Sequence, residues 1–134
     1  KGARDMIDKF MSSGVTTVLV TGSAQGTTLG RLNDDFPGAF PEDRRVTANN
    51  VSRGKPYPEP YLKAMSIAGV KPEESVVIDN APLGVKSGAD SGAFTIGVTT
   101  GPVPEAALYD AGADYVFGSM EALATGLNEL LEPR

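Results

Sequence analysis

The chain contains no cysteine and no histidine. Without cysteine it cannot form disulfides, thiolate metal sites or a cysteine nucleophile, and without histidine it lacks the commonest general base and zinc ligand. Any metal must therefore be held by oxygen atoms, which favours Mg²⁺ or a similar hard cation. No apolar run approaches the length of a membrane span and no signal peptide is visible. We therefore expect a cytoplasmic protein without a membrane partner.

Positive charge is also scarce. The chain has 12 lysine and arginine residues against 17 acidic ones, for a formal net charge of -5. An acidic surface disfavours nucleic acid as a partner. An anionic substrate would need local positive charge, so each lysine near the end of a strand gains importance. With 134 residues the chain is one domain or part of one, and the opening Lys1-Gly2-Ala3 resembles the interior of a longer polypeptide.

Apolar periodicity predicts an alternation of strands and helices. Strands are expected over 15–20, 46–48, 76–78, 93–98 and 115–117, and helices over 3–11, 25–33, 58–68, 83–91, 104–111 and from Ser119 onward. Residues 34–45 are expected to form a loop. Gly69 and Gly92 follow two of the helices as stop signals. This alternation predicts an α/β fold in which a parallel sheet carries helices on both faces.

Three polar segments follow predicted strands, at the edge where open parallel sheets bind ligands. The first is Thr21-Gly22-Ser23, in which hydroxyl and backbone N–H groups at a strand–helix turn can hold a phosphate. The alternative is that Thr21 merely caps the following helix.

The second segment is Gly54-Lys55-Pro56, which continues as Tyr-Pro-Glu-Pro. Glycine allows close backbone approach, and the prolines stiffen the loop. A lysine fixed in such a loop is a good point charge for a phosphate. The alternative is a solvated loop lysine.

The third segment is Asp79-Asn80, at the end of the apolar run Ser-Val-Val-Ile. An aspartate in this place can bind Mg²⁺ through a carboxylate oxygen, with water filling further positions. The alternative is that Asp79 is the N-cap of the next helix.

The three segments together resemble the haloacid dehalogenase (HAD) superfamily, and most of all its β-phosphoglucomutase and phosphoglycolate phosphatase subfamily. The resemblance implies a three-layer Rossmann-like core and a Mg²⁺-dependent phosphohydrolase for small phosphorylated metabolites, or a sugar phosphomutase. It implies that Thr21, Gly22 and Ser23 bind the phosphoryl group, that Lys55 neutralises its charge, and that Asp79 and Asn80 hold Mg²⁺. The family usually has an acid in the place of Asn80, so weaker metal binding is expected.

One family motif is absent. HAD enzymes carry an N-terminal Asp-x-Asp motif whose first aspartate attacks phosphorus and whose second acts as general acid and base. No such motif occurs in this sequence, and Asp34-Asp35 lacks a preceding apolar strand. Residues 1–134 therefore resemble the C-terminal part of one core domain, with the motif strand and the helical cap domain expected before Lys1.

The absent strand would lie between the strands over 15–20 and 76–78. Its loss would leave backbone groups unpaired inside a sheet, at about 1–3 kcal/mol each. We expect that the two strands pair directly, that a missing N-terminal fragment or a second copy supplies a strand, or that the chain is a clipped remnant.

Two other functions stay open. Residues 20–26 resemble the opening of a short-chain dehydrogenase, but Thr28 replaces the final glycine of the Thr-Gly-x-x-x-Gly-x-Gly motif and no Tyr-x-x-x-Lys occurs. The chain could instead be an inactive phosphate- or metal-binding fragment.

Overall fold

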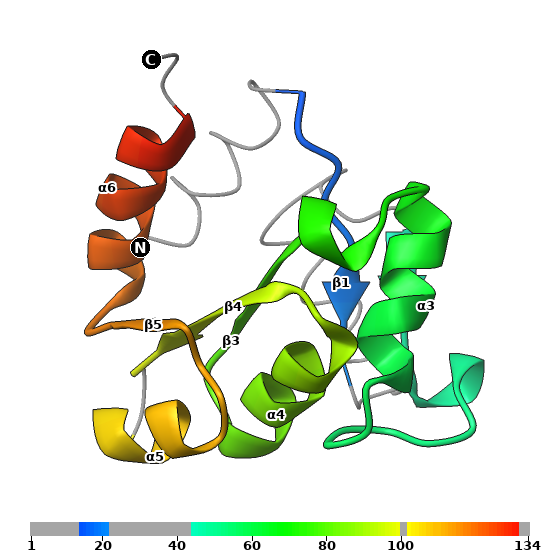
Figure 1. The fold of residues 1–134 in the computed structure, drawn as a ribbon, viewed down its shortest axis with the longest axis horizontal. Coiled ribbons are helices and arrows are strands. Elements are labelled where there is room, and N and C mark those ends of the chain that lie inside the picture. Colours follow the sequence, from blue (N-terminus) through cyan, green and yellow to red (C-terminus); the bar gives the residue numbers. More distant parts are fainter. Residues whose placement is uncertain (1–13, 22–43, 100–101, 132–134) are drawn as a thin grey trace, which may run out of the picture.

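The computed structural model describes residues 14–21, 44–99 and 102–131 (Figure 1). Within these ranges no helix is long and apolar enough to cross a membrane. The strands are β1 (Leu19–Val20), β2 (Arg45–Val46), β3 (Val76–Asp79), β4 (Phe94–Val98) and β5 (Tyr115–Phe117). The helices are α3 (Glu59–Ala68), α4 (Pro82–Ser91), α5 (Glu105–Asp110) and α6 (Met120–Leu131), with short 3-10 turns η2 (Ala48–Asn50) and η3 (Pro72–Glu74).

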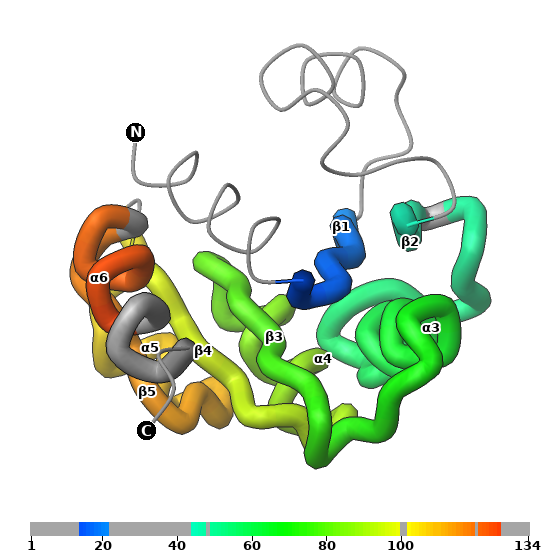
Figure 2. The backbone as a smooth tube through the Cα atoms, turned by 90° about the horizontal axis from the view of Figure 1, so that it is seen from above, coloured from blue at the N-terminus to red at the C-terminus, as the bar shows by residue number. Residues whose placement is uncertain are grey.

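All pairings between these strands are parallel. β1 pairs with β2, and β3, β4 and β5 form a second sheet in that order. Figure 2 shows the five strands across the molecule in the order β5, β4, β3, β1, β2. Within the described strands β1 and β3 are not paired, so direct pairing, one of the three outcomes expected for the gap between them, is not found. Within each sheet the carboxyl ends of the strands lie at one edge, because all of its strands are parallel.

Helices cover both faces of the larger sheet, as the α/β pattern predicts. On one face α4 and α5 pack against β3, β4 and β5 around a cluster of buried residues, which comprises Val85, Leu108, Ala113 and Val116. α3 extends this face through Tyr61 and Met65, which pack against Val77. On the other face Leu123 of α6 packs against Ile96 and Val98. The described part of the chain is thus a three-layer α/β core (Figure 1).

Most element predictions within these ranges are confirmed. α3 ends at Gly69 and α4 at Gly92, whose φ values of 73° and 92° are the left-handed conformation that glycine accepts most readily. Ser119 caps α6, because its Oγ accepts a hydrogen bond from the Ala122 N–H at 2.9 Å.

Three sequence predictions are corrected. The strand predicted over 46–48 is observed as β2 at Arg45–Val46, because Thr47 caps the 3-10 turn η2 that begins at Ala48. The strand predicted over 15–20 is paired only at Leu19–Val20, because β2 gives it one short partner. Leu62 and Ile67, which belong to the apolar pattern of α3, are exposed, whereas Tyr61 and Met65 are buried. The helices predicted over 3–11 and 25–33 lie outside the described residues.

Leu108 offers a test of this packing. Its side chain is completely buried between α5 and the sheet, so Leu108→Ala leaves a cavity. We expect the free energy of unfolding to fall by about 2–5 kcal/mol in urea denaturation. Leu62→Ala, on the exposed side of α3, should cost well under half as much. Equal losses for the two variants would contradict the packing described.

Candidate active site

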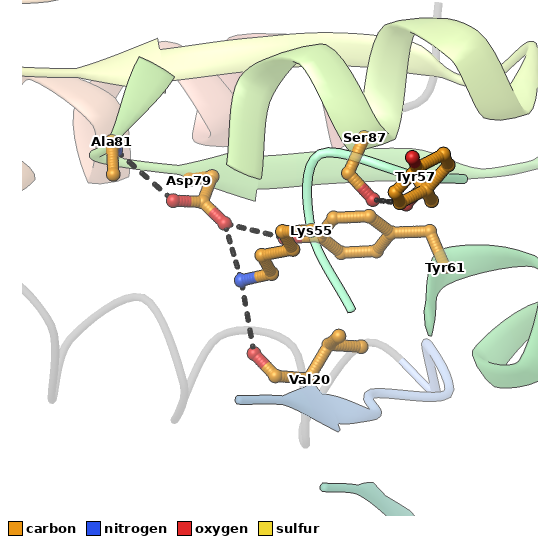
Figure 3. Close-up of polar contacts among 7 residues, drawn as sticks. All are labelled: Val20, Lys55, Tyr57, Tyr61, Asp79, Ala81 and Ser87. Carbon is orange, nitrogen blue, oxygen red and sulfur yellow. Dashed lines mark hydrogen bonds and ion pairs between the residues drawn. The ribbon is translucent and has the colours of Figure 1, made fainter. Parts of the chain in front are cut away.

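The candidate site lies where β1 and β3 end (Figure 3). Lys55, from the loop before α3, crosses the gap between the two sheets. Its Nζ donates to Asp79 Oδ2 at 2.7 Å and to the Val20 carbonyl at 3.4 Å. Two residues predicted from the sequence, Lys55 and Asp79, are therefore in direct contact, and Lys55 also contacts the end of the strand that carries Thr21.

The Asp79 carboxylate is almost fully buried, with 8% of the side chain exposed. Oδ2 accepts from Lys55 and from the Tyr61 hydroxyl at 2.6 Å, while Oδ1 accepts from the Ala81 N–H at 3.0 Å. Buried charges need such partners, because desolvation is otherwise costly. The N-cap of α4 is Ala81 and not Asp79, so the simple capping alternative is wrong for this residue.

Hydrogen bonds with α3 and with α4 fix the loop that carries Lys55. The Glu59 carboxylate accepts hydrogen bonds from the backbone N–H groups of Ser52 and Arg53, at 2.6 Å and 3.2 Å. The Ser87 hydroxyl donates to the Tyr57 carbonyl at 2.6 Å, which ties the loop to α4 (Figure 3). With 22% of its side chain exposed, Lys55 is not the solvated loop lysine that was the alternative.

Tyr61 is a member of the site that the sequence pattern did not reveal. It lies on the buried face of α3, where any apolar residue would satisfy the helical spacing. Burial raises the pKa of its hydroxyl well above the ordinary value, and the negative charge of Asp79 and the hydrogen bond donated to it act in the same direction. The hydroxyl therefore remains protonated and donates to Asp79. The one sequence signal for its role was a hydroxyl-bearing tyrosine on an otherwise apolar helix face.

Gly84 is the second residue that the sequence pattern did not reveal. A Cβ atom at this position would overlap the Asp79 carboxylate, so only glycine lets the first turn of α4 pass so close to it. Its signal was present in the run Asp-Asn-Ala-Pro-Leu-Gly, but spacing alone does not say which side chain a glycine accommodates.

The remaining predicted residues lie at the same edge or outside the described ranges. The Thr21 N–H donates to the Val46 carbonyl at 2.9 Å, which fixes Thr21 directly after β1 and next to the carbonyl that Lys55 contacts. Asn80 follows Asp79 at the end of β3. Gly22 and Ser23 are not among the described residues.

This edge supplies some, but not all, of the oxygen ligands that a hard cation needs. Asp79 and Asn80 offer carboxylate and amide oxygens, which are ligands of Mg²⁺ in proteins. Within residues 14–21, 44–99 and 102–131, however, no three acidic side chains gather into a metal-binding group. A complete magnesium site would need further oxygen ligands from elsewhere.

The chain belongs to the haloacid dehalogenase-like hydrolases, whose family model matches residues 1–92. This match includes residues 20–26, the segment that resembled a short-chain dehydrogenase. The dehydrogenase alternative therefore gains no support from the family comparison. The chain is 33% identical to hexitol phosphatase A of Escherichia coli (strain K12) over 72% of its own length, and 38% identical to 2-deoxyglucose-6-phosphate phosphatase 2 of Saccharomyces cerevisiae over 53%.

Solved structures give the same family. One named "Putative beta-phosphoglucomutase from Bacteroides vulgatus" is 46% identical, covers 96% of this chain and superposes with a TM-score of 0.90. A HAD family hydrolase from Deinococcus radiodurans R1, solved with bound phosphate and sodium, is 28% identical, with a TM-score of 0.86 and coverage of the whole chain. The chain spans 52% and 62% of these two structures, and 44% and 31% of the bacterial and yeast phosphatases named above.

Gly84 provides a test of the carboxylate's placement. Gly84→Ala should push the Asp79 carboxylate away from Lys55 and Tyr61 and lower the free energy of unfolding by about 2–4 kcal/mol, because a buried charge loses its partners. Gly54→Ala is the matched control, since a Cβ there meets no atom within 4 Å, and it should change stability by less than about 0.5 kcal/mol. Urea denaturation measures both; a neutral Gly84→Ala would contradict the close approach.

The raised pKa of Tyr61 predicts a loss of stability in alkali. Above pH about 10 the unfolded chain releases the Tyr61 proton while the folded chain keeps it, so the free energy of unfolding falls by up to about 1.4 kcal/mol per pH unit from this group. Below that pH the group contributes no slope. In metal-free buffer, Tyr61→Phe should lose stability less steeply than the wild type between pH 10 and 11. If the free energy of unfolding fell equally steeply with pH in both proteins, Tyr61 would not be held in its protonated form.

Proposed function

We propose that this chain is the C-terminal part of the core of a Mg²⁺-dependent phosphohydrolase that acts on small phosphorylated metabolites through an aspartyl-phosphate. The observation that carries the proposal is the contact between Lys55 and Asp79 at the carboxyl edge of the sheets, beside the end of β1. An ammonium and a carboxylate held together at this edge supply the charges that phosphoryl transfer needs.

Each residue has a distinct task in this proposal. Lys55 offsets the negative charge of the phosphoryl group and of the attacking carboxylate. The hydroxyl groups of Thr21 and Ser23 and the backbone N–H of Gly22 hold the phosphoryl oxygens. Asp79 and Asn80 supply oxygen ligands for Mg²⁺. When bound, Mg²⁺ adds positive charge next to the transferring group.

The nucleophile comes from outside residues 1–134. An aspartate at the end of a strand seated between β1 and β3 would arrive at the edge where Lys55 lies, since parallel strands end together. Its carboxylate oxygen attacks phosphorus, the substrate's alkoxide leaves and is protonated, and water then hydrolyses the aspartyl-phosphate to release inorganic phosphate. A missing N-terminal fragment would provide that strand; a second copy of the chain could complete the sheet but would bring no such motif, because residues 1–134 lack Asp-x-Asp.

The relatives support a phosphorylated sugar or polyol as the substrate class. Hexitol phosphatase A and 2-deoxyglucose-6-phosphate phosphatase carry such substrates in their names. The structure from B. vulgatus favours a second candidate, a sugar phosphomutase, in which the aspartyl-phosphate is passed to a sugar hydroxyl instead of water. Release of inorganic phosphate without a sugar acceptor distinguishes the first candidate from the second.

A chimeric protein tests the proposal. The portion of the B. vulgatus protein that this chain does not cover is joined before Lys1, and hydrolysis of p-nitrophenyl phosphate with Mg²⁺ is measured. We expect the chimera to be active and Lys55→Met to lower kcat/KM by about 10²–10³-fold, because one preorganised charge is lost. Asp79→Asn should raise the Mg²⁺ concentration needed for activity.

Matched controls lie on α4. Lys86 and Asp90 form an exposed ion pair at 2.9 Å, so Lys86→Met and Asp90→Asn should leave activity unchanged. An active chain of residues 1–134 that loses activity on Asp79→Ala would place the nucleophile within this chain and overturn the proposed division. A folded chimera that binds phosphate or Mg²⁺ but has no activity would favour the inactive binding fragment.

A further inference from the structure

Tyr61 touches both members of the ion pair. Its hydroxyl donates to Asp79 Oδ2 at 2.6 Å, the oxygen that also accepts from Lys55, and its ring centroid lies 5.3 Å from Lys55 Nζ. Figure 3 shows the ring of Tyr61 reaching from α3 to the pair. An ammonium this close to an aromatic ring is attracted to its face. A single side chain therefore holds the carboxylate through its hydroxyl and the lysine through its ring.

The surrounding core does not require this hydroxyl. Tyr61 packs with Met65, Val77 and Ala93, and phenylalanine would fill the same space in that apolar cluster. A buried hydroxyl is costly unless it has a hydrogen-bond partner, and its partner here is Asp79. The hydroxyl thus belongs to the ion pair and not to the apolar packing.

We propose that Tyr61 is a positioning residue that keeps Asp79 in place when Lys55 turns from the carboxylate to a phosphoryl group. The proposal rests on the proposed function, because it concerns the same lysine. If Lys55 were the only donor to Oδ2, its departure would leave that buried oxygen without a partner, which is strongly unfavourable. With Tyr61 on Oδ2 and the Ala81 N–H on Oδ1, both oxygens keep a hydrogen bond.

The expected consequence is that loss of the hydroxyl ties Lys55 to Asp79. Tyr61→Phe keeps the ring and its contact with the ammonium but makes Lys55 the remaining side-chain donor to Oδ2 among the described residues. Lys55 should then be less available to an anion. The affinity for phosphate should therefore fall about tenfold, which is the size of effect expected from one hydrogen bond to a charged group.

The test uses residues 1–134 in metal-free buffer with inorganic phosphate as the probe. The NMR signals of the Lys55 side-chain ammonium are followed during the phosphate titration. Tyr61→Phe should raise the dissociation constant about tenfold. Tyr115→Phe, a half-exposed tyrosine at the start of β5, is the matched control and should behave as the wild type. In an Asp79→Asn background, where no buried charge awaits a partner, Tyr61→Phe should have little further effect.

The outcomes separate this role from the proposed function. Equal phosphate affinity in the wild type and a folded Tyr61→Phe would overturn the positioning role and leave the phosphohydrolase proposal standing. An undiminished effect in the Asp79→Asn background would also overturn it, because the hydroxyl would then act through packing. A wild-type Lys55 that does not respond to phosphate would contradict the proposed function, and the positioning role with it.

Discussion

The ion pair between Lys55 and Asp79 is the constraint on which the rest of the site depends. It is largely withdrawn from water, with 22% and 8% of the two side chains exposed, and it joins the end of β3 to a loop before α3. Burying two charges is unfavourable unless their geometry is good and the remaining lone pairs are bonded. The Tyr61 hydroxyl and the Ala81 N–H donate to the carboxylate oxygens, and Gly84 leaves room for the carboxylate.

Lys55 also donates a hydrogen bond to one edge of the smaller sheet, which is formed by β1 and β2. The Thr21 N–H points to β2, where it donates to the Val46 carbonyl, and in an extended strand the carbonyl before it points to the opposite side. That carbonyl, of Val20, is the one that Lys55 approaches on the side of the gap. Lys55 thus supplies a donor to an edge that has no strand partner among the described residues. A strand seated in the gap would compete for this carbonyl and leave the ammonium to Asp79 and the site.

The sequence predicted most of the described elements, and it singled out Lys55 and Asp79, because those signals are local. Gly69 and Gly92 end helices through their own backbone conformation, and Asp79 stands at the end of an apolar run that any strand assignment would find. The contacts of Asp79 are not local: Lys55 is 24 residues away and Tyr61 is 18. Periodicity treats Tyr61 as one more apolar residue of α3, so its hydroxyl had no visible partner until the fold placed one. The predicted roles of Thr21, Gly22, Ser23, Lys55, Asp79 and Asn80 in binding stay predictions.

Asn80 alters the balance of charge in the proposed reaction. Lys55 and Asp79 cancel one another, so an arriving aspartate nucleophile adds a negative charge to this edge before the substrate binds. An acid in the place of Asn80, as the family usually has, would make that charge more negative and attract a divalent cation more strongly. On the proposed function, the amide would weaken the attraction for Mg²⁺ but would also reduce repulsion of an anionic phosphoryl group. More of the charge stabilisation would then fall on Lys55, whose release from Asp79 is the step that the proposed role of Tyr61 makes easier.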